Sequence, residues 1–88
     1  MSPNVNLRYG EYRFCFFSNE NGEPMHVHAY AGTDPKNNAK FWILPDGTVG
    51  FAHNKARIPD QDITKIIKFL SVNYAEVVAA WYRHFGTL

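Results

Sequence analysis

The chain has 88 residues, which predicts one domain over residues 1–88, and its 45% hydrophobic and 16% aromatic content excludes a disordered protein. Nine basic and eight acidic side chains give a formal net charge of +1 at pH 7, which argues against strong, indiscriminate binding to nucleic acid. The sequence has no run near the ~18 apolar residues of a membrane span, no signal-peptide pattern and a single cysteine, Cys15, so we predict a protein of the reducing cytoplasm with no membrane partner.

The first part of the chain, over about residues 6–52, has the alternating pattern of a β-sheet. Strands are expected near 6–9 and over 12–17, 26–31 and 39–44, with another short strand or edge over 48–52. Residues that favour turns separate them at 10–11, 18–24, 32–35 and 45–47. The pattern predicts an antiparallel sheet of three to five strands.

Alternation also assigns the side chains to the two faces of this sheet. One face is apolar and is expected to be buried, and it carries Val27, Ala29, Ala31, Ala39, Phe41 and Ile43. The opposite face is mixed, and it carries His26, His28, Tyr30, Lys40, Trp42 and Leu44. A face that combines polar and aromatic side chains is typical of a binding surface.

The last part of the chain has a helical period. Apolar residues at 63, 66, 67 and 70 follow the i, i+3, i+4, i+7 spacing, and Pro59 with Asp60 supplies a start signal. Asn73 followed by Glu76 resembles a capping box, so we expect a bend near 71–73 and a second helix anchored by Trp81. The predicted fold class is α+β, with one or two helices over about residues 60–86 on the apolar face of the sheet.

The tripeptide His26-Val27-His28 is the strongest candidate site. Imidazoles at i and i+2 of a strand project from the same face, roughly 7 Å apart at the usual rise per residue. Two ring nitrogens can then converge on one metal ion, phosphate or water. The sequence leaves three interpretations of the pair open.

In the structural interpretation, the two histidines are partly buried and satisfy polar groups of the preceding loop. In the catalytic interpretation, His26 and His28 are the acid–base pair of a metal-independent ribonuclease, in which one ring takes the proton of a 2′-hydroxyl and the other donates one. Lys40 then stabilises the phosphate. The ligand-binding residues of this interpretation are Tyr30 and Trp42, which stack on a base, and Arg57, which contacts a phosphate from the loop before the helices.

The metal interpretation needs a third protein ligand, because zinc takes at least three. His53 is the obvious third ligand beside His26 and His28, with Glu20, Glu23 or Asp34 as further donors. The other two interpretations require no cofactor, and zinc is the alternative.

The aromatic load of so small a domain predicts association with a partner. Tyr30, Trp42 and Phe51 are more than one small core is expected to absorb, and a small sheet also leaves an unpaired strand edge. The expected partner is a second copy of the chain or a cognate small protein.

Four segments of the sequence resemble a small prokaryotic family that is known as domain of unknown function number four-one-six-zero. They are the run from Tyr12 to Glu20, Pro24-Met25-His26-Val27-His28, Ala39-Lys40-Phe41-Trp42-Ile43, and Ala80 to Gly86. Their order and spacing make the resemblance specific, and it covers almost the whole chain. The sequence departs from the family pattern at Met25, at Ala29 and in the tight turn at 44–49.

The resemblance implies that the protein acts together with the product of a neighbouring gene. Genes of the family often lie beside a second small gene, in pairs that are interpreted as toxin–antitoxin modules, which suits a small interaction protein that binds or acts on RNA. The resemblance assigns no reaction.

Overall fold

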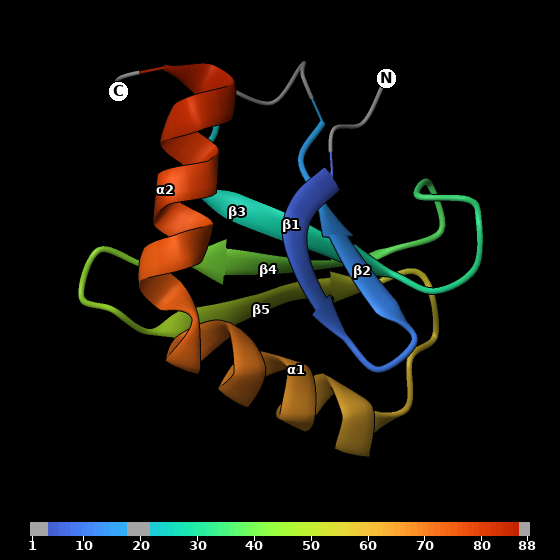
Figure 1. Ribbon diagram of the computed structural model, residues 1–88. Helices are drawn as coiled ribbons and strands as arrows, with labels where there is room; N and C mark the ends of the chain where they lie inside the picture. Colours follow the sequence, from blue (N-terminus) through green and yellow to red (C-terminus); the bar gives the residue numbers. More distant parts are fainter. Residues whose placement is uncertain (1–3, 18–21, 87–88) are drawn as a thin grey trace.

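The computed structural model describes residues 4–17 and 22–86, and it contains one sheet and two helices (Figure 1). The strands are β1 (Asn4–Tyr9), β2 (Tyr12–Cys15), β3 (His26–Tyr30), β4 (Ala39–Ile43) and β5 (Val49–Asn54), and they are followed by α1 (Asp60–Val72) and α2 (Tyr74–Phe85). The sheet order is β1-β2-β3-β4-β5, and every neighbouring pair is antiparallel. The predicted α+β fold is confirmed: five antiparallel strands precede two C-terminal helices.

Tight turns join the strands where the sequence supplies turn residues. Gly10 and Gly47 take positive φ angles of 56° and 90° between β1 and β2 and between β4 and β5, a conformation that costs glycine little. In the second turn Asp46 Oδ1 accepts hydrogen bonds from Thr48 N at 3.0 Å and Thr48 Oγ1 at 2.6 Å. These bonds lower the pKa of Asp46. The loop predicted at 18–24 lies partly outside the described residues, which resume at Gly22.

The strand register gives the sheet one apolar face, called here the helix face. Val27 pairs with Phe41 and Ala29 pairs with Ala39, and all four side chains are fully buried. They belong to one core cluster with Ile66, Leu70, Val77 and Trp81 of the helices. In Figure 1, α1 runs beside β5 and α2 stands at the end of the sheet where β3 begins. The predicted buried face is confirmed, and so is the burial of Trp81.

The bend between the helices is confirmed, but the predicted capping box at Asn73 is wrong. The Asn73 side chain makes no capping bond to α2. Its Nδ2 and its backbone N each donate to the Phe69 carbonyl oxygen, at 2.9 and 3.0 Å. Asn73 therefore stands at the end of α1 and at the start of α2, but its side chain caps only α1, because its amide group bonds to the preceding turn. Within the described residues, neither helix is long and apolar enough to cross a membrane.

A partly buried hydrogen bond joins β2 to the first turn of α1. Tyr12 Oη donates to Asp62 Oδ2 at 2.7 Å, and the Tyr12 side chain is buried. Burial raises the pKa of Tyr12 to about 12, and the Asp62 carboxylate adds to the rise because it accepts the phenol proton. The neutral phenol is therefore part of the folded state.

This shift predicts alkaline instability that depends on Tyr12. The unfolded pKa of a tyrosine is about 10, so the stabilisation is complete below pH 10 and is lost as the pH rises from about 10 toward 12. Tyr12→Phe removes the titrating group, and we expect its free energy of unfolding to fall less steeply over this range than that of the wild type. Urea unfolding at several pH values measures this difference, and equal slopes would contradict the assignment.

Candidate functional site

The predicted site residues share one face of β3 and β4, called here the outer face. His26 pairs with Trp42 and His28 pairs with Lys40 in the antiparallel register, so the four side chains lie opposite the helix face. The row of His28 and Lys40 continues to Cys15 of β2 and to His53 of β5. The shared face expected from alternation is confirmed.

His26 is a fully buried polar side chain. Its Nδ1 lies 2.8 Å from the Pro24 carbonyl oxygen, and because a carbonyl only accepts, Nδ1 carries the proton and donates it. The ring also meets two indoles edge to face, Trp42 at 5.7 Å and Trp81 at 5.4 Å between centroids. His26 thus connects the segment before β3 with the outer face and with α2.

His28 is bound to the loop between β3 and β4. Its Nδ1 lies 2.8 Å from Asn38 Oδ1, and both side chains are buried. The orientation of the Asn38 amide is fixed, because Nδ2 donates to the carbonyl oxygens of Pro35 and Lys36 at 2.8 and 3.2 Å. Oδ1 is therefore the acceptor and His28 Nδ1 the donor. Phe17 also contacts this ring edge to face, 4.5 Å away between centroids.

The two imidazoles lie close together on the outer face. Their centroids are 5.1 Å apart and their planes are perpendicular. With the proton on Nδ1 in both rings, Nε2 is the atom that each would offer to a metal ion or to a transferred proton. His53, the third ligand of the zinc interpretation, is half-buried and 6.4 Å from His28 between centroids. Within residues 4–17 and 22–86, no three His, Cys, Asp or Glu side chains are placed to hold a metal ion.

Lys40 is already paired with an acid. Its Nζ lies 2.6 Å from Glu23 Oε1, and its side chain is only 12% exposed. The same ammonium group lies 4.4 Å from the centroid of the Trp42 ring, a cation–π contact. A phosphate on this face would have to compete with Glu23 for the charge of Lys40.

The ligand-binding residues of the catalytic interpretation do not form one open surface. Tyr30 is only 4% exposed, so its ring offers no stacking face to a base, and Trp42 is half-buried. Arg57 lies in the loop between β5 and α1, with an exposed side chain and a positive φ of 57°. Of these three residues, Arg57 alone has an exposed side chain.

Sequence reasoning missed one of the two groups that hold the histidines. The Pro24 carbonyl, which binds His26, belongs to the preceding loop, as the structural interpretation expected. Asn38, which binds His28, was not considered, because asparagine is common in turn-forming segments such as the one that it ends. Glu23 was considered only as a metal donor, and it binds Lys40.

The comparison with protein families identifies the chain. The model of the family described as "Domain of unknown function (DUF4160)" matches residues 11–82. The chain belongs to this family. The matched region begins before β2 and ends within α2, so it contains both histidines and their loop partners. No curated protein and no solved structure matches the chain.

Proposed function

We propose that this DUF4160 protein is a small cytoplasmic interaction module of the toxin–antitoxin type, which binds a partner protein and is not a catalyst. In this proposal His26 and His28 of β3 have a structural role. They bind two loops to the outer face and so fix the surface that the partner contacts. The observation that carries the structural role is the burial and bonding of the two histidines. Both are buried, and each Nδ1 is bonded to a loop atom at 2.8 Å.

The same burial weighs against an acid–base function on RNA. A general acid or base must come within hydrogen-bond reach of the substrate atom whose proton it moves. His26 is 0% exposed and His28 is 3% exposed, so a ribose could reach them only after the surrounding segments moved. Lys40, which would stabilise the phosphate, is paired with Glu23.

Exposed apolar side chains support a function in protein binding. Phe51 is 49% exposed on β5, an edge strand of the sheet, and Leu44, Val72 and Tyr82 are also exposed. An exposed edge strand that carries an apolar side chain can pair with another chain. A domain of this size also gains stability from the surface that it buries by association.

Co-expression with the product of the neighbouring gene tests this function. We expect the two proteins to elute together at a fixed ratio in size-exclusion chromatography, and we expect the DUF4160 chain alone to leave a labelled RNA intact. His28→Asn, which keeps a donor near the position of Nδ1, serves as the matched variant and should retain the complex.

Two results would contradict the proposal. One is a DUF4160 chain that elutes as a free monomer in the presence of the neighbouring product and in its absence. The other is RNA cleavage that survives EDTA and disappears in His28→Asn while the melting temperature is unchanged.

A further inference from the structure

A shallow groove follows β1, at the edge of the sheet opposite to β5. The β1–β2 register is interrupted between Val5 and Arg8, so Asn6 and Leu7 have no partner residue in β2. Two hollows adjoin at this bulge. The first has a volume of about 380 Å³ and extends from Val5 to Arg8 and Arg13. The second has a volume of about 160 Å³ and lies between the bulge and α2, where it is lined by Glu76, Ala79 and Arg83. We call the two hollows together the β1 groove.

The β1 groove carries an excess of positive charge. Arg8 and Arg13 are exposed and directly opposite each other in the strand register, and Arg83 adds a third guanidinium from α2. Like charges that face each other across two strands repel. Within the described part of the chain, no carboxylate forms an ion pair with any of these arginines. An acidic group bound between Arg8 and Arg13 would remove this repulsion and accept charge-assisted hydrogen bonds from both.

The chemistry of the groove favours a protein strand over RNA. Among the described residues, β1 is paired with a strand on one side only, and an extended peptide can add to the other side through its backbone. An RNA site would be expected to offer an aromatic ring for base stacking. The residue paired with Arg13 on its other side is Tyr30, and that ring is 4% exposed.

We infer that the β1 groove is the docking site for an extended acidic segment of the partner protein, which adds to β1 as a sixth strand and places carboxylates between Arg8 and Arg13. This inference rests on the proposed function, since it names the chemistry of the partner. Among the described residues, Glu76 is the one acidic residue that lines the groove, and it would repel an acidic strand that ran close to α2. The acidic side chains of the segment therefore belong at the Arg8–Arg13 end.

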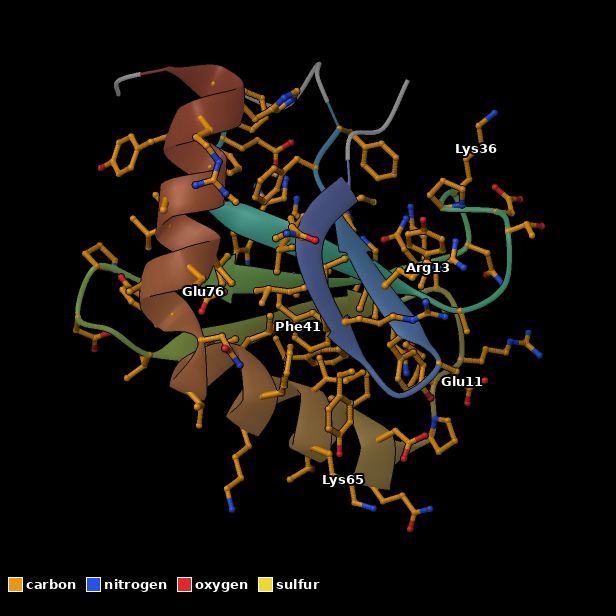
Figure 2. All side chains as sticks on the ribbon, in the orientation of Figure 1. Glu11, Arg13, Lys36, Phe41, Lys65 and Glu76 are labelled. Carbon is orange, nitrogen blue, oxygen red and sulfur yellow. The ribbon has the colours of Figure 1, made fainter. Side chains whose placement is uncertain are left out.

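A short capped peptide of alternating valine and glutamate is the probe. We expect it to shift the amide resonances of residues 5–8 in a ¹⁵N-labelled sample of the whole chain. The double variant Arg8→Glu with Arg13→Glu should weaken the peptide about tenfold or more and should bind instead a peptide with lysine in place of glutamate. Lys65→Glu with Lys68→Glu is the matched control, because it makes the same charge change on exposed residues of α1, and Figure 2 shows Lys65 well away from Arg13.

Several results would overturn the inference. Shifts elsewhere than in residues 5–8, or equal weakening by both double variants, would show that the peptide does not use this groove. Equal binding of a peptide whose backbone amides are N-methylated would exclude strand addition, and a uridine oligonucleotide that competes fully at the same residues would identify a site for RNA. The amide shifts that the peptide causes in the wild-type chain show by themselves where it binds. They therefore test the groove even if the charge-reversed variant does not fold. A stable complex with the neighbouring gene product that is unaffected by the reversal would refute the groove and leave the proposed function standing.

Discussion

Trp81→Ala is expected to lower the free energy of unfolding by about 3–5 kcal/mol, a large share of the roughly 5–15 kcal/mol that stabilises a small domain. Trp81 is fully buried, and its ring contacts Phe16 at 5.3 Å, His26 at 5.4 Å and Phe85 at 4.2 Å between centroids. The substitution leaves a cavity at the point where α2 meets β2 and β3. Urea unfolding followed by circular dichroism measures the loss, and the melting temperature should fall by more than about 10 °C.

Trp81→Phe is the matched control for this position. The Trp81 Nε1 is buried and has no hydrogen-bond partner among the described residues, so phenylalanine removes an unsatisfied donor and keeps most of the apolar volume. We expect the loss of stability to be less than half of that in Trp81→Ala. A Trp81→Phe variant as unstable as Trp81→Ala would mean that the indole N–H has an acceptor and that volume is not the dominant contribution.

His26→Ala is expected to cost about 2–4 kcal/mol of stability, because it removes a buried hydrogen bond and leaves a cavity. The lost donor leaves the Pro24 carbonyl without the bond from Nδ1, and the lost ring leaves a gap between Trp42 and Trp81. The measurement is again urea unfolding, with an assay of partner binding at a temperature where both proteins are folded. A variant with wild-type stability and a specific loss of activity would favour the catalytic interpretation.

Substitution by asparagine or by glutamine distinguishes the contribution of Nδ1 from that of Nε2 in each histidine. The amide nitrogen of asparagine lies near the position of Nδ1, and that of glutamine lies near the position of Nε2. If Nδ1 is the atom that holds the fold, His26→Asn and His28→Asn should each retain more stability than the corresponding glutamine variant. The reverse order would show that Nε2 makes the decisive bond, as a metal-binding or proton-transferring histidine requires.

Much of the fold was predictable because alternation and helical spacing are local properties of the sequence. Val27 and Phe41 alternate with His26 and Trp42, and burial of the apolar set on one face excludes every register of the two strands that is shifted by one residue. The break between α1 and α2 was predictable for the same reason, since the polar residues Ser71 and Asn73 interrupt the apolar stripe.

The burial of side chains on the outer face was not predictable, because it depends on the paths of the loops that cover them. Alternation places Tyr30 and His28 on this face, but it does not indicate that both rings are covered. The cover depends on contacts such as that of His28 with Asn38, ten residues away, and that of Lys40 with Glu23, seventeen residues away. The capping box predicted at Asn73 was wrong for a similar reason. An asparagine side chain can bond to the turn before it or to the turn after it, and the sequence does not show which.

The tautomer of His26 and His28 is the most direct test of their structural role. A long-range ¹H–¹⁵N spectrum of the folded protein at pH 8 distinguishes a proton on Nδ1 from a proton on Nε2. The bonds to Pro24 and Asn38 predict that both rings carry the proton on Nδ1, and burial predicts that both resist diethyl pyrocarbonate in the native state. Rings that carry the proton on Nε2, or that react as fast as in the unfolded chain, would contradict the structural role assigned to His26 and His28.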